Sequence, residues 1–162
     1  MQNKDHIDFW VQTALRDWDV ANDLNQSGKF MYCLFFAHLT VEKLLKAHWL
    51  KDTGESAPPK VHSLTTLHEK IAFKLPSHLE AELPIITAWN LEARYQDYKD
   101  RFYKICTPEY TAAKLNIVNE LKECLIKGCN RIIEAILIRI AGIWVQAPEG
   151  IPFRIICKKQ AE

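Results

Sequence analysis

Three charged residues interrupt an otherwise apolar stretch of the chain. Residues 30–50 read FMYCLFFAHLTVEKLLKAHWL and contain Glu42, Lys43 and Lys46. On a helix, Lys43 and Lys46 share a face, and Glu42 pairs with Lys46 at the four-residue spacing, which adds about 0.2–0.5 kcal/mol. Two lysine ammonium groups can bind phosphate as point charges. The same residues can instead form a solvated stripe on the exposed side of a central helix, and spacing alone leaves both interpretations open.

His62 is a second candidate, because it follows a proline-containing loop and directly precedes a predicted helix. Histidine changes charge near neutral pH. His62 can therefore line the same cleft as Lys43 as a polar group that responds to pH. Its alternative role is a packing or capping contact of the loop.

Arginine and tyrosine alternate in residues 94–107, RYQDYKDRFYKICT. We single out Arg94, Tyr95 and Arg101 here. Aromatic rings interleaved with guanidinium groups stack on bases and bind phosphates. The same composition is typical of a dimer interface, where tyrosine and arginine are enriched. Both interpretations stay open at this point.

Other common routes to chemistry find no support in the sequence. No GxGxxG, P-loop, HExxH or GxSxG signature is present. The histidines share no metal-ligand spacing, and the five cysteines include no CxxC pair. We therefore expect no catalytic residue among the common types, no metal and no cofactor.

Composition favours one soluble globular domain. The chain has 162 residues, a net charge of +1, 48% hydrophobic and 25% charged residues. Such a balance gives no general attraction for nucleic acid or anionic membrane. The N-terminus lacks the apolar run of a signal peptide, and residues 132–145 are too short and too charged to span a bilayer. We expect a cytoplasmic protein with no membrane partner.

Helical periodicity covers most of the chain and predicts the elements that position these residues. Helices are expected over residues 5–26, 29–51 and 63–73. Ser77 with Glu80 predicts a capping box that opens a fourth helix reaching 89–92, with a kink or a later start at Pro84.

The rest of the chain divides into a loop, a helix and a tail. Residues 94–107 are expected to form an ordered surface loop, and Thr107 is expected to cap a long helix that ends near residue 141. Residues 142–162 are expected to form an extended arm or small hairpin. The predicted fold is all-α, an up-and-down bundle of four to five helices over residues 1–141, with a tail at 142–162.

The order of these motifs resembles the HEPN domain, named for nucleotide binding in higher eukaryotes and prokaryotes. The resemblance covers roughly residues 5–129 and is carried best by VEKLLKAHWL at 41–50, by the His62-Ser63-Leu64 start and by Ala93-Arg94-Tyr95. It implies a bundle that pairs as a homodimer. For stand-alone prokaryotic members it also implies a nucleotidyltransferase partner, as in toxin–antitoxin systems.

Active ribonucleases of that family use an Arg followed, after four to six residues, by a His. None of the six arginines here has a His five to seven positions later. We therefore expect a non-catalytic module that binds a nucleotide or RNA, a partner nucleotidyltransferase, or both. The alternatives are a degenerate metal-independent ribonuclease that uses Arg94 or Arg101 with a distant His such as His62, and a purely structural interaction domain.

Overall fold

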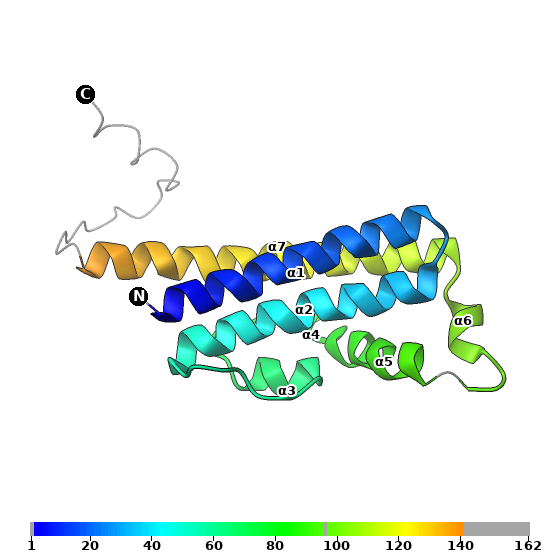
Figure 1. The fold of residues 1–162 in the computed structure, drawn as a ribbon, viewed down its shortest axis with the longest axis horizontal. Coiled ribbons are helices and arrows are strands. Elements are labelled where there is room, and N and C mark those ends of the chain that lie inside the picture. Colours follow the sequence, from blue (N-terminus) through cyan, green and yellow to red (C-terminus); the bar gives the residue numbers. More distant parts are fainter. Residues whose placement is uncertain (1, 96, 141–162) are drawn as a thin grey trace, which may run out of the picture. The chain divides into compact units, whose positions relative to one another are not determined.

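The computed structural model describes residues 2–95 and 97–140, and over these residues the chain is helical, with no strand, as predicted. Seven helices follow one another in these ranges (Figure 1): α1 Gln2–Gln26, α2 Phe30–Thr53, α3 Leu64–Glu69, α4 Ser77–Glu80, α5 Leu83–Arg94, α6 Arg101–Ile105 and α7 Pro108–Ile140. The predicted all-α bundle is confirmed.

Contacts divide the chain into two units, residues 1–130 and 131–162. Helices α1 to α6, the part of α7 up to Asn130 and the sites below belong to the first unit. The predicted tail, residues 142–162, lies outside the described residues, and the division at residue 141 stays a prediction.

Helix α2 is the centre of the bundle. It contacts α1, α3, α5 and α6. Its apolar side chains point in several directions, and Leu34, Leu44 and Leu45 are completely buried. A helix that is apolar around most of its circumference must be covered on several sides. Any polar group on α2 is therefore placed inside the bundle unless it lies on a narrow exposed strip.

Glycines end the two long N-terminal helices. Gly28 has a φ of +70°, and just beyond it the Lys29 N–H donates to the Leu24 carbonyl at 2.8 Å. Gly54 has the same φ, and its N–H donates to the Leu50 carbonyl at 2.9 Å. Only glycine adopts this left-handed conformation without steric cost, so both helices end where the sequence provides one.

Helix α3 is shorter than predicted. It begins after Ser63, whose hydroxyl accepts a hydrogen bond from the Thr66 N–H at 3.3 Å, but it ends at Glu69 rather than near residue 73. The chain beyond it is tied to the end of α2, because the Asp52 carboxylate accepts a hydrogen bond from the Ala72 N–H at 2.7 Å. This contact from outside the helix replaces the next helical turn.

The predicted capping box at Ser77 is wrong. Pro76 occupies the cap position without a side-chain hydrogen bond, and its carbonyl accepts from the Leu79 and Glu80 N–H groups at 3.0 Å each. Helix α4 ends at Glu80, and α5 begins at Leu83 with Pro84 in its first turn. The later start that Pro84 predicted is therefore confirmed.

Residues 94–107 were predicted to form a surface loop. This prediction is wrong for part of the segment, because it contains helix α6. Phe102 and Cys106, four residues apart, are 9% and 6% exposed and place one side of this segment against the core. Their burial stabilises a helical turn, which the polar composition of the segment did not indicate. Thr107 caps α7 as predicted, since its hydroxyl accepts from the Tyr110 N–H at 3.2 Å.

Gly128 lies at a close contact between α7 and the rest of the bundle. A Cβ at this position would lie 2.6 and 2.8 Å from ring carbons of Phe73 and 2.9 Å from the Cε1 of His48. The two rings pack with their centroids 4.8 Å apart, and the His48 Nε2 lies 2.9 Å from the Leu125 carbonyl oxygen. The missing side chain is therefore what lets α7 approach α2.

We predict that Gly128→Ala destabilises the protein by about 1–3 kcal/mol, the cost of overpacking a filled core. Helix propensity alone would favour alanine over glycine by about 1 kcal/mol, so packing and propensity predict opposite signs. Urea unfolding measures the difference, and Phe73→Leu should restore most of the lost stability. A Gly128→Ala protein as stable as the wild type would contradict this packing.

Candidate functional site

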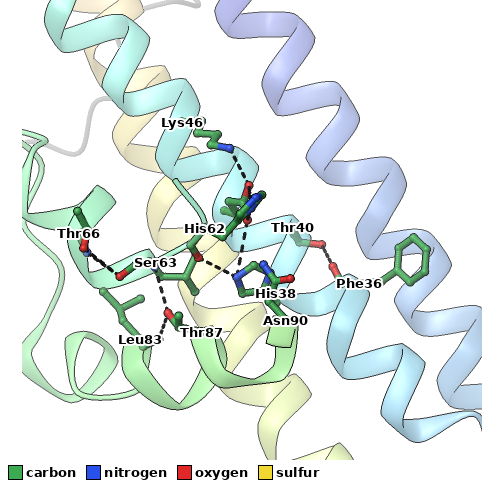
Figure 2. A network of polar contacts seen from close by, with 12 residues as sticks. Phe36, His38, Thr40, Lys46, His62, Ser63, Thr66, Leu83, Thr87 and Asn90 are labelled. Carbon is green, nitrogen blue, oxygen red and sulfur yellow. Dashed lines mark hydrogen bonds and ion pairs between the residues drawn. The ribbon is translucent and has the colours of Figure 1, made fainter. Parts of the chain in front are cut away.

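The Glu42 carboxylate lies at the centre of a polar network inside the bundle. Glu42 is 5% exposed and accepts a hydrogen bond from the Lys46 ammonium group at 2.7 Å. Its other oxygen lies 3.0 Å from the Nδ1 of His62, which comes from the loop before α3. Lys46, His62 and His38 converge on this point (Figure 2). We call these four residues the Glu42 network.

The network keeps Glu42 ionised. Burial alone would raise the pKa of this carboxyl, but the hydrogen bonds from Lys46 and His62 outweigh burial and hold its pKa below the ordinary value. The pair with Lys46 is itself buried, since Lys46 is 6% exposed. Removing one partner of such a pair leaves an uncompensated charge in the interior.

His38 joins the network as a neutral ring. Burial lowers its pKa, against the opposing influence of Glu42 and of the His62 carbonyl. Its Nε2 lies 3.2 Å from that carbonyl oxygen and 3.7 Å from a Glu42 oxygen. A neutral ring that donates from Nε2 leaves Nδ1 unprotonated, and Nδ1 is buried with no hydrogen-bond partner among the described residues.

Backbone contacts fix the His62 loop from the other side. The Leu64 N–H donates to the Thr87 hydroxyl of α5 at 3.1 Å, and this hydroxyl donates to the Leu83 carbonyl at 2.7 Å. Figure 2 shows these contacts beside His38 and Asn90. The loop is therefore held between α2 and α5, while the His62 side chain remains 58% exposed.

The solvated-stripe interpretation of Glu42 and Lys46 is wrong, because both side chains are buried. Lys46 lies with its ammonium group 5.6 Å from the centroid of the Trp10 ring. Lys43 pairs with Asp17 of α1, with 2.6 Å between the charged atoms. The structure thus brings Lys46 and His62 together through Glu42. Lys43 lies apart from them, against α1, where it pairs with Asp17.

Arg94 and Tyr95 lie at the end of α5. The Arg94 Nε donates to the Asn90 carbonyl at 3.0 Å, and its guanidinium lies 5.8 Å from the centroid of the Tyr95 ring. Among the described residues, no carboxylate forms an ion pair with Arg94. Besides burial, the positive charge of Arg94 contributes to lowering the pKa of His38.

Arg101 belongs to a separate site. It begins α6, and its Nε donates to the Asp97 carboxylate in an ion pair. Together with Tyr95 it lines a pocket of about 370 Å³, whose other lining residues are Glu92, Asp97, Asp100, Phe102, Tyr103 and Ile105. We call this the α6 pocket. The structure therefore divides the sequence-based candidates between the Glu42 network, the end of α5 and the α6 pocket, with Lys43 apart.

His38 belongs to the Glu42 network and Asn90 lies beside it (Figure 2), but neither was among the residues predicted for the site. His38 stands four residues before Glu42, the spacing at which two side chains meet on a helix, so the sequence held a signal for it. Asn90 is 4% exposed and beside the network only because α5 packs on α2, which no local spacing reveals. Among the residues described, no group of three histidine, cysteine or acidic side chains is placed to hold a metal ion.

Comparisons with known proteins place the chain in a family. No curated protein matches the sequence at a significant level. The structure is similar to the crystal structure of TT1696 from Thermus thermophilus, with a TM-score of 0.65 and 13% identity over 75% of this chain and 97% of that one. No helix among the described residues is long and apolar enough to cross a membrane. The HEPN domain matches residues 7–135, most of the length, and the chain therefore belongs to the HEPN domain family.

Proposed function

We propose that this HEPN protein is a non-catalytic binding module whose main ligand is another protein, bound on the surface around the α6 pocket. The observation that carries the proposal is the exposure of Tyr95, Tyr103 and Ile105, which are 71%, 62% and 52% exposed and line one pocket. Tyrosine is enriched in protein interfaces because its ring gives a large contact area at low entropic cost.

The state of the cations also favours a protein over a phosphate ligand. Lys43, Lys46 and Arg101 each form an ion pair with a carboxylate of the same chain. A phosphate would have to compete with these carboxylates for the positive groups. Lys46 is in addition buried, so a ligand could reach it only by opening the bundle. Three of the four lysine and arginine side chains predicted to bind phosphate are thus already neutralised.

The resemblance to stand-alone members of the family supplies the identity of the partner. It implies a nucleotidyltransferase encoded nearby, as in toxin–antitoxin pairs, and it implies that the module itself pairs as a homodimer. We propose both, with the enzyme bound at the α6 pocket surface. Light scattering of the purified chain, alone and with the enzyme, measures the mass of each assembly.

We predict that Tyr95→Ser with Tyr103→Ser weakens binding of the neighbouring nucleotidyltransferase at least about tenfold, because the exposed rings provide the contact area. Isothermal calorimetry with the two purified proteins measures the affinity. Tyr32→Ser is the matched control, since Tyr32 is 49% exposed but lies on α2 outside the pocket. Binding that is equally weakened by the control, or unchanged in the double variant, would contradict the assignment.

A nucleotide or RNA is the second candidate ligand, and the end of α5 favours it. Arg94 has no carboxylate partner among the described residues, and its guanidinium adjoins the exposed Tyr95 ring. Such a pair can bind a phosphate and stack on a base. His62, more than half exposed, is a further polar group that a ligand in solvent can reach.

Calorimetry with ATP, GTP and a short RNA tests this second candidate. Binding is expected to weaken about fivefold or more in Arg94→Gln and to stay unchanged in Lys43→Gln, because Asp17 already neutralises Lys43. Equal effects of the two variants would remove the site from the end of α5.

The same RNA, incubated with the protein in chelator, should remain intact, whereas cleavage that His62→Ala abolishes would establish the degenerate ribonuclease instead. A chain that binds neither enzyme nor nucleotide is a purely structural domain.

A further inference from the structure

We propose that the α6 pocket binds an organic cation, the guanidinium or ammonium group of a side chain that the protein partner presents. The inference rests on the proposed function, since it names the chemistry by which the partner would be recognised at the same surface. It departs from the expectation that residues 94–107 attract phosphate, and it assigns a separate role to the acidic residues of that segment.

The charges that line the pocket are mostly negative. Glu92, Asp97 and Asp100 supply three carboxylates against the single guanidinium of Arg101. Arg101 pairs with Asp97, so Glu92 and Asp100 have no ion-pair partner among the described residues. Arg101 is also attracted to the Glu92 carboxylate. A phosphate entering this pocket would still meet three carboxylates against one guanidinium, whereas a cation would be attracted by the excess of negative charge.

The Asp97 carboxylate already has partners within the protein. Besides Arg101, its carboxylate accepts hydrogen bonds from the backbone N–H groups of Lys99 at 2.9 Å and Arg101 at 3.3 Å. These contacts hold the turn that leads into α6. Asp97 therefore shapes the pocket and is not the group that meets a ligand.

Asp100 is placed differently from an ordinary acidic residue before a helix. An aspartate at this position normally accepts a hydrogen bond from the first helical turn. Asp100 instead has a φ of +50°, and its side chain makes no capping hydrogen bond. A non-glycine residue in this conformation is strained, and such strain is concentrated at functional sites. Since no ion pair of Asp100 is found among the described residues, we take its carboxylate as the group that meets the ligand.

The Glu92 carboxylate also lines the α6 pocket. Burial raises the pKa of the Cys106 thiol to about 11, and the negative charge of Glu92 contributes to that rise. Cys106 follows α6 directly, so the field of Glu92 reaches the helix that forms one wall of the pocket. Carboxylates from α5 and from the turn before α6 thus line one cavity.

Aromatic rings complete the walls. Tyr95, Phe102 and Tyr103 line the pocket together with the carboxylates. A guanidinium or ammonium group over an aromatic face is attracted by the negative face of the ring. The methylene stem of lysine or arginine can pack along the same rings. A cavity of about 370 Å³ is of the size that small ligand groups occupy.

A metal ion fits this pocket less well than an organic cation. A divalent ion needs several oxygen ligands within about 2.0–2.6 Å. No three acidic, histidine or cysteine side chains converge closely enough for that in the part of the chain that the structure describes. Widely spaced carboxylates among aromatic rings suit a larger cation, whose charge is spread over a planar group or carried on a flexible stem.

The test uses N-acetyl-L-arginine amide as the probe and the full chain as the protein. Titration followed by ¹H–¹⁵N NMR is expected to shift the backbone signals of Tyr95, Arg101 and Tyr103 in a saturable way. Glu92→Gln combined with Asp100→Asn should weaken probe binding at least about fivefold. The uncharged analogue N-acetyl-L-citrulline amide should leave these signals in place.

A matched control separates the site from net charge. Asp19→Asn combined with Glu69→Gln removes the same number of negative charges from exposed positions outside the pocket, and it should bind the probe like the wild type. Equal binding by the pocket variant, equal weakening by the control, or equal shifts with the citrulline analogue would each overturn the proposal. Titration with AMP that shifts the same signals more strongly would also overturn it.

The failure of this inference is distinguishable from the failure of the proposed function. The Glu92→Gln and Asp100→Asn variant should also bind the nucleotidyltransferase at least about tenfold more weakly. If the enzyme binds that variant normally while Tyr95→Ser with Tyr103→Ser weakens it, the docking surface stands and the cation pocket is rejected. If the probe binds as expected but the enzyme does not bind the wild type, the pocket stands and the proposed partner is rejected.

Discussion

The ion pair between Glu42 and Lys46 is the constraint on which the rest of the structure depends. A carboxylate and an ammonium group on the most buried helix must satisfy each other, because either alone would carry an uncompensated charge into the core. Their pairing lets α2 remain in the centre of the bundle. Glu42 also meets the His62 ring, and His38 meets the His62 carbonyl, so that the loop between α2 and α3 is attached to the central helix beside this ion pair.

Three of the positive side chains that the sequence predicts to bind phosphate are paired with carboxylates of the same chain. Glu42 neutralises Lys46, Asp17 neutralises Lys43, and Asp97 neutralises Arg101. The ammonium groups of Lys46 and Lys43 on α2, and the guanidinium of Arg101 at the start of α6, are thus each held in place by a nearby carboxylate. The surface that we propose for a partner is therefore the one formed by the exposed tyrosines around the α6 pocket.

Much of the fold could be predicted from the sequence, and the failures have physical causes. Gly28 and Thr107 mark helix boundaries through local backbone geometry, which a single residue type determines. The capping box at Ser77 failed because the Pro76 carbonyl took its place, and α6 was missed because the burial of Phe102 is a tertiary effect. The four-residue spacing of Glu42 and Lys46 was visible in the sequence, but their burial was not. The pattern of apolar residues along a helix does not show how many other helices pack against it. For the same reason the acidic character of the α6 pocket, which unites Glu92 with Asp100, emerged only from the folded chain.

A double-mutant cycle on Glu42 and Lys46 tests the central claim most directly. Urea unfolding of the wild type, Glu42→Gln, Lys46→Met and the double variant gives the coupling energy between the two side chains. A buried pair that organises the bundle should show a coupling of about 1.5 kcal/mol or more, with each single variant destabilised by roughly 3 kcal/mol. A coupling below about 0.5 kcal/mol, the value for an exposed pair on a helix, would contradict the central role of this interaction.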